Sequence, residues 1–266
     1  MSRMAEFSIE YRTNDSPMPS SRVEYICLEN CNVSLDYLSD RLLLFANVKE
    51  LHLTNIQFTV LPESIKECKF LWRLVLDNCK ELREIQEIPP CLTMLSALNC
   101  KSLTSSSKSK LLNQKLHEAG NTWFLLPEAK IPEWFDHQGS IGFSISFRFR
   151  NKFPAIILCY VSPFTWKSRD TGPVPFRVII NGKTFFFTHG LNDIRRTDRR
   201  LYVDTHHLHL FHMEMENFKD NIDKALLENK WSHAEVHFGF SLMYSGIHVL
   251  KDKSSMEDFQ FTNPDI

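Results

Sequence analysis

One apolar spacing occurs four times in the first hundred residues, and this repeat limits the possible folds more than any other feature of the chain. In each copy, four positions at fixed distances carry apolar residues or cysteine, and the copies occupy residues 23–31, 48–56, 71–79 and 92–100. A period of roughly 20 to 29 residues predicts stacked units, because a single unit of this size cannot bury its apolar row alone.

The centre of each copy predicts a short strand with two different faces. In Leu51-His52-Leu53 the leucines alternate with a residue that must point the opposite way. The spacing is that of leucine-rich repeats, in which each unit supplies one strand to a parallel sheet. We therefore expect residues 22–104 to form an α/β leucine-rich-repeat solenoid of about four repeats. The leucines should lie inside, and the alternating residues should face an open concave side.

Cysteine content and charge indicate the class of protein. The chain has 266 residues, seven cysteines and a formal net charge of −1. Cys31, Cys79 and Cys100 occupy equivalent repeat positions, so we expect reduced, structural thiols and neither disulfides nor a metal site. The charge gives no case for binding nucleic acid or membrane. Without a secretory signal at its start, the chain should be cytoplasmic or also nuclear.

The segments outside the repeats suggest three further zones. Residues 1–21 are polar and contain proline, so we expect a poorly ordered lead-in, a remnant of an earlier repeat, or a cap for the first one. Residues 105–122 should be a linker with a short helix that ends at Gly120. Residues 123–266 contain alternating segments such as 143–150, and Asn181-Gly182 between two apolar runs predicts a hairpin. Many short strands without long helices predict an all-β antiparallel sandwich.

Four segments after the repeats resemble a known domain. Residues 126–138, 144–147, 150–155 and 246–250 resemble, in this order, parts of the jelly-roll/Ig-like domain (C-JID) that follows the repeats in plant TIR-NBS-LRR disease resistance proteins. The resemblance covers residues 105–266, and Leu-Pro-Glu-Ser-Ile at 61–65 fits the same receptors. It implies a recognition module without a cofactor. In such receptors the repeats and the C-JID contact a pathogen effector, and TIR domains are then brought into an NAD-cleaving arrangement.

This chain lacks the parts of these receptors that carry chemistry. It contains no TIR segment and no nucleotide-binding core, and its Gly182-Lys183-Thr184 has Arg177 where a Walker A motif needs its first glycine. We therefore expect no enzyme activity from this chain.

Three other patterns have two interpretations, one as a chemical site and one as ordinary structure. His207 and His209 could bind Zn²⁺ with Asp204, although histidines on a wet strand face are common. Asp136-His137 near Ser140 resembles part of a hydrolase triad but lacks a nucleophile elbow. The basic residues between 195 and 200 could contact phosphate or an acidic partner, although a solvated loop is favoured.

Geometry selects candidate partner-binding residues better than residue chemistry does. On the repeats, the candidates are the residues that alternate with core leucines: Tyr25, Glu29, Glu50, His52, Thr54, Arg73, Asp77, Met94 and Ser96. In the second domain, the candidates lie in loops: Trp166, Lys167, Arg169, Asp170, Arg195, Arg196, Arg199 and Arg200.

The expected partner is a protein: a pathogen effector, a guarded host protein or a full-length receptor. Two alternatives remain at this point. One is a regulatory or decoy fragment of such a receptor, and the other is a jelly-roll glycan binder in which Trp134, Trp166 and Tyr160 stack on sugar rings.

Overall fold

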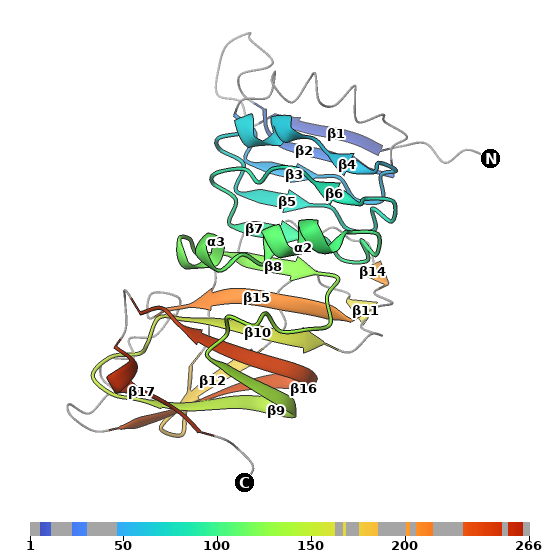
Figure 1. The fold of residues 1–266 in the computed structure, drawn as a ribbon. Helices are drawn as coiled ribbons and strands as arrows, with labels where there is room; N and C mark the ends of the chain where they lie inside the picture. Colours follow the sequence, from blue (N-terminus) through green and yellow to red (C-terminus); the bar gives the residue numbers. More distant parts are fainter. Residues whose placement is uncertain are drawn as a thin grey trace. The chain divides into compact units, whose positions relative to one another are not determined.

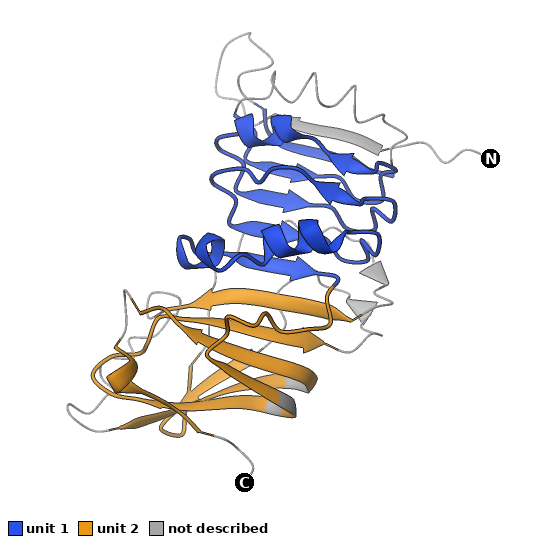
Figure 2. Ribbon diagram, viewed as in Figure 1, with its two compact units in different colours: residues 1–127 blue, residues 128–266 orange. Residues whose placement is uncertain are grey.

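The computed structural model of the chain shows two compact units, residues 1–127 and 128–266, which are described separately below (Figure 2). The structure describes residues 6–11, 23–30, 47–162, 167–168, 176–185, 201–202, 206–214, 231–251 and 255–262. Within these ranges, every helix is too short or too polar to cross a membrane.

The first unit is organised around a ladder of short parallel strands (Figure 1). Its members are, in spatial order, β2 (Val23–Glu29), β3 (Glu50–His52), β5 (Arg73–Val75), β7 (Met94–Ser96) and β8 (Trp123–Leu126), and β1 (Glu6–Tyr11) pairs antiparallel with β2. The registers place one apolar residue of each parallel strand in a single row: Ile26, Leu51, Leu74, Leu95 and Phe124.

The segments that return from one strand to the next contain little regular structure. β4 (Val60–Leu61) and β6 (Glu84–Ile85) form a parallel pair, and a 3-10 helix, η3 (Glu63–Glu67), begins after Pro62. Helix α2 (Ser105–Leu111) is capped by the Thr104 side chain, which accepts a hydrogen bond from the Ser107 amide. The Asn113 side chain caps α3 (Gln114–Glu118) in the same way through the Lys115 amide.

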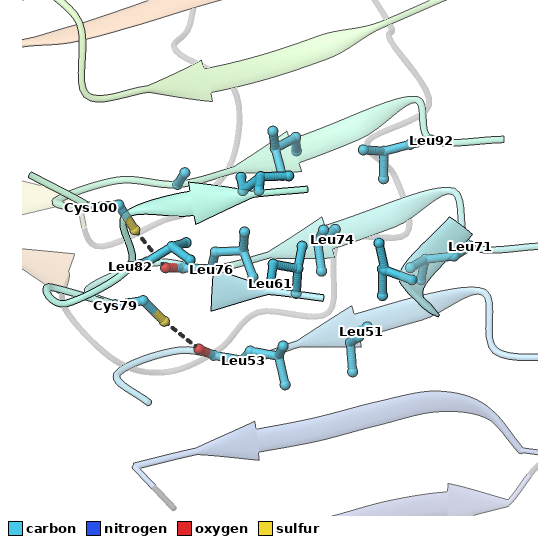
Figure 3. Packing of buried hydrophobic residues seen from close by; sticks show 14 of the residues in the cluster. Leu51, Leu53, Leu61, Leu71, Leu74, Leu76, Cys79, Leu82, Leu92 and Cys100 are labelled. Atoms are coloured by element: carbon cyan, nitrogen blue, oxygen red, sulfur yellow. Dashed lines mark hydrogen bonds between the residues drawn. The ribbon is translucent and has the colours of Figure 1, made fainter. Parts of the chain in front are cut away.

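The core of the first unit lies between the strands and the return segments (Figure 3). Leu51, Leu53, Leu71 and Leu76 are fully buried there, as is Leu61 from a return segment. Burial of a leucine side chain stabilises a fold by about 1.5–3 kcal/mol. The prediction that the repeated leucines point inward is therefore confirmed.

The second unit is an antiparallel sheet centred on two long strands. β16 (Ser232–Val249) pairs with β9 (His137–Phe149) along most of its length, with an irregularity between His237 and Leu242. The first part of β16 also pairs with β12 (Phe176–Ile180) and its last part with β10 (Ile156–Ser162).

Shorter elements complete the second unit. β15 (His207–Met213) pairs with β10, β13 (Lys183–Phe185) with β12, and β17 (Phe259–Phe261) with β9. A 3-10 helix, η7 (Met256–Asp258), precedes β17, and β11 (Lys167–Ser168) pairs with β14 (Leu201–Tyr202) in a small separate sheet.

The predicted hairpin at Asn181-Gly182 is confirmed. It joins β12 to β13, and both turn residues have positive φ, 50° for Asn181 and 80° for Gly182, as a tight two-residue turn requires. The Asn181 side-chain oxygen also accepts a hydrogen bond from the His233 amide at 2.9 Å. Because Lys183 and Thr184 lie in a strand and not at the start of a helix, this segment is not a phosphate-binding loop.

The predicted fold class, an α/β leucine-rich-repeat solenoid followed by an all-β antiparallel sandwich, is wrong. Strands account for 44% of the structure and helices for 12%, in mixed and antiparallel sheets, and this does not indicate a leucine-rich-repeat solenoid. In the second unit, β16 bonds to β9, β10 and β12, so these strands belong to one hydrogen-bonded sheet.

The return segments explain the first part of this error. An α/β unit needs a helix between successive strands, but in the described stretch between β3 and β5 the only helix is the short 3-10 helix η3, and the Pro89-Pro90 pair between β5 and β7 interrupts the hydrogen bonding of a regular helix. The apolar period therefore predicted where the strands lie but not what connects them.

Candidate functional site

The candidate site is the side of the parallel ladder that points away from the leucine core. We call it the polar strand face, and it is made by Tyr25, Cys27, Glu29, Glu50, His52, Arg73, Asp77, Met94 and Ser96. Strand register aligns these side chains in rows. Tyr25, Glu50, Arg73 and Met94 occupy equivalent positions on successive strands, and Cys27 lies beside His52 in the next row.

An ion pair connects β3 and β5 on this face. Arg73 Nη1 lies 3.3 Å from Glu50 Oε2, and the Arg73 side chain is almost fully buried. Burial alone raises the pKa of Glu50, but His52 and the Arg73 guanidinium outweigh it and hold this pKa below its ordinary value. Glu50 is therefore ionised at neutral pH, and the pair fixes the position of both side chains.

Tyr25 and His52 extend the site toward β2. Their rings meet edge to face with centroids 5.0 Å apart. Burial lowers the pKa of His52 despite the neighbouring Glu50 carboxylate, so the imidazole is neutral at neutral pH. Burial also raises the pKa of the Tyr25 hydroxyl, and Cys27 adds to this effect. Both rings therefore contribute neutral groups to the site.

A buried carboxyl group connects β5 and β7. The Ser96 hydroxyl donates to Asp77 Oδ1 at 2.6 Å, and the Leu98 amide donates to the same oxygen at 2.9 Å. Burial raises the pKa of Asp77 to about 6, although the two hydrogen bonds oppose the shift. Asp77 therefore changes its charge close to neutral pH.

Exposure differs from the sequence prediction on most of this face. His52, Arg73, Asp77, Met94 and Ser96 were expected on an open concave side, but their exposed fractions are only 2%, 3%, 6%, 7% and 4%. The prediction of an open surface is wrong for these five residues. Tyr25, Glu29, Glu50 and Thr54 are partly exposed. Side-chain alternation identifies which way a residue points, but it does not identify how deeply the side chain is buried in the fold.

Sequence reasoning overlooked Cys27 on this face. The signal was available, because Cys27 lies two residues after Tyr25 and two before Glu29 and therefore shares their side of β2. The loop candidates of the second domain cannot be placed in the same way. Trp166, Arg169, Asp170, Arg195, Arg196, Arg199 and Arg200 lie outside the described residues, and Lys167 is described only as part of the backbone of β11.

The histidines of β15 lie in a buried environment and not on a wet strand face. His207 and His209 are 1% and 4% exposed, and the Tyr160 ring stacks on His209 with centroids 4.5 Å apart. Burial lowers the pKa of His209 to about 3, and His207 contributes to the shift. Asp204, the third ligand considered for zinc, lies outside the described residues.

Asp136 contacts a partner other than the one that a triad would need. Its Oδ2 lies 2.8 Å from His248 Nδ1 and accepts a hydrogen bond from the Val249 amide at 2.9 Å, whereas His137 stacks on Phe261. Two of the segments that carry the family resemblance, residues 126–138 and 246–250, therefore meet in the structure.

The aromatic platform considered for sugar binding is not assembled as expected. Tyr160 is 1% exposed, and Trp134 stacks on Phe135 with centroids 4.3 Å apart, while Trp166 lies outside the described residues. A buried tyrosine cannot present its ring to a sugar.

Comparison with known proteins relates the chain to plant defence. No protein-family model matches it. The chain is similar to TMV resistance protein N of Nicotiana glutinosa, with 27% identity over 181 residues that cover 52% of this chain. The match spans 16% of the length of that protein. By this similarity, the chain is related to a plant resistance protein.

Proposed function

We propose that the chain is a recognition module of a plant intracellular immune receptor and binds a pathogen effector or a guarded host protein. The observation that carries the proposal is its similarity to a plant resistance protein. The resemblance of residues 105–266 to the post-repeat domain of TIR-NBS-LRR receptors supports it further. On this proposal the chain works in the cytoplasm by binding its partner, without turnover.

The accessible part of the polar strand face is the proposed contact surface. Tyr25, Glu29 and Glu50 are partly exposed there and lie on neighbouring strands. Aromatic side chains often dominate protein interfaces, and rigid strands hold such groups in position before a partner arrives. Arg73 supports this surface from below by its ion pair with Glu50. The surface is therefore narrower than the sequence indicated and centred on β2 and β3.

Binding can be tested by co-immunoprecipitation of the tagged chain from plant cells, against a panel of cytosolic pathogen effectors. We expect one effector to be retained by the wild-type chain and lost with Tyr25→Ala or Glu29→Lys. Phe70→Ala is the matched control, because Phe70 is 56% exposed but lies outside the polar strand face. Thermal melting of each variant separates a lost contact from a lost fold.

Two results would count against this proposal. If both surface variants still retain an effector, the contact surface lies away from β2 and β3. Recovery of a full-length receptor in place of any effector would instead indicate a regulatory or decoy fragment.

A further inference from the structure

A cluster of metal-ligating groups lies on β2 and β3 and shares Glu29 with the proposed contact surface. The Cys27 thiol, a Glu29 carboxylate oxygen and a His52 ring nitrogen all lie within 4.8 Å of one another. Strand register produces this arrangement, because Cys27 and His52 are directly paired across the parallel ladder, and Glu29 follows on the same side of β2. The cluster therefore belongs to the backbone framework and does not depend on a loop.

One member of the cluster has a buried polar atom without a hydrogen bond. His52 is 2% exposed, and its Nε2 makes no hydrogen bond in the part of the chain that the structure describes. Glu50 Oε2 lies 3.8 Å from this nitrogen, which is too far for a hydrogen bond. A buried ring nitrogen without a partner costs free energy. A metal ion at the centre of the cluster would supply the missing partner.

We propose that Cys27, Glu29 and His52 bind one Zn²⁺ ion through Sγ, a carboxylate oxygen and Nε2. A thiolate, an imidazole and a carboxylate together favour Zn²⁺ over the harder Mg²⁺ and Ca²⁺, which prefer oxygen ligands alone.

The distances agree with this coordination after a small adjustment. Zinc bonds of about 2.0–2.3 Å in a tetrahedron place ligand atoms roughly 3.3–3.8 Å apart. Side-chain rotations can close the remaining gap from 4.8 Å. Three protein ligands leave the fourth position to water or to a partner's side chain. Cys27 loses its proton to the solvent when the Zn–S bond forms.

This site would add a function that the sequence prediction excluded. The cysteines expected to be structural were those in the repeat register, such as Cys79 and Cys100, and Cys27 lies outside that register. The inference does not depend on which partner the chain recognises, because this chain itself supplies all three ligands.

Zinc and cobalt titrations of the whole purified chain, after treatment with a chelator, test the proposal. We expect one Zn²⁺ per chain by calorimetry, and Co²⁺ should give a thiolate-to-cobalt charge-transfer band. Cys27→Ser or His52→Gln should weaken zinc binding more than about 100-fold, since loss of an outer-shell partner alone costs 10–100-fold. Cys91→Ser is the matched control, because Cys91 is an exposed free cysteine away from the cluster.

A second measurement avoids the risk that a ligand variant fails to fold. In the wild-type chain, Zn²⁺ should slow alkylation of Cys27 and leave that of Cys91 unchanged, and a chelator should reverse the effect. Either of two results would overturn the proposal: folded Cys27→Ser that binds zinc as tightly as the wild type, or a Cys27 alkylation rate that saturating zinc does not change.

Discussion

Cys79 donates its thiol hydrogen to the backbone carbonyl of Leu53, with sulfur and oxygen 2.9 Å apart (Figure 3). One repeat later, Cys100 donates to the carbonyl of Leu76 over the same distance. Both cysteines are fully buried. Each thiol fills space in the core and satisfies a backbone oxygen just beyond a strand, so the structural role expected for these cysteines is confirmed.

Cys79→Ala should destabilise the chain by about 1–2 kcal/mol, because it removes a buried sulfur atom together with its hydrogen bond. Urea denaturation followed by circular dichroism measures the difference. Cys91→Ala is the control, since Cys91 is exposed and the change there should stay within about 0.5 kcal/mol. Equal midpoints for the two variants would contradict a structural role for the thiol.

Asparagine side chains form a second ladder beside the cysteines. Asn55, Asn78 and Asn99 all have positive φ, and the Asn99 side-chain amide donates through Nδ2 to the Asn78 side-chain oxygen at 2.8 Å. Alanine at position 78 should cost about 1 kcal/mol more than glycine, because both changes remove the hydrogen bond but only alanine opposes a φ of 60°. Denaturation of Asn78→Ala and Asn78→Gly under identical conditions checks this, and equal stabilities would rule out backbone conformation as the reason for asparagine.

Sequence patterns predicted those features of the first unit that depend on neighbouring residues in the chain. The alternation around Leu51, Leu74 and Leu95 placed these residues in the core, and they are at most 1% exposed. The asparagine ladder could also have been predicted, since Asn stands just before the last position of every copy. The burial of Arg73 and His52 could not, because it depends on how side chains from neighbouring strands, such as Glu50 and Tyr25, pack beside them in the fold.

Long-range pairing limited prediction in the second unit. Asn181-Gly182 specified its turn by itself, whereas the pairing of β9 with β16 joins Phe149 to Ser232 across a long stretch of chain. Register between such distant strands depends on which faces become buried in the complete fold. Local alternation therefore identified individual strands, but it could not show that one strand bonds to β9, β10 and β12.

Asp77 should make stability depend on pH. Its pKa is about 6 in the folded chain against an ordinary value of 3.8, so the folded state binds more protons than the unfolded state between these values. Stability should therefore fall as pH rises from about 4 to about 7, by about 2 kcal/mol from this group. Asp77→Asn can still accept the Ser96 and Leu98 hydrogen bonds and does not titrate.

The measurement is the difference in unfolding free energy between Asp77→Asn and the wild type at each end of this pH range. As pH rises, the wild type should lose stability relative to Asp77→Asn. Parallel pH profiles for the two proteins would show that Asp77 is ionised in the same way in the folded and unfolded states.

Gly246 tests how tightly two distant segments of the second unit pack together. A Cβ atom at this position would lie 2.8 Å from Ile131 Cγ2 and 3.0 Å from Phe135 Cδ1, which is closer than carbon atoms can approach without movement. Gly246→Ala should therefore destabilise the chain by about 1–3 kcal/mol, as overpacking does in other cores. Gly120→Ala is the control, because its added Cβ would meet nothing closer than 3.9 Å. It should be neutral or up to about 1 kcal/mol more stable, since alanine restricts the unfolded chain. Thermal and urea denaturation of both variants measure these differences. If Gly246→Ala is as stable as the wild type, Ile131 and Phe135 can move away from the added methyl group at little cost in free energy.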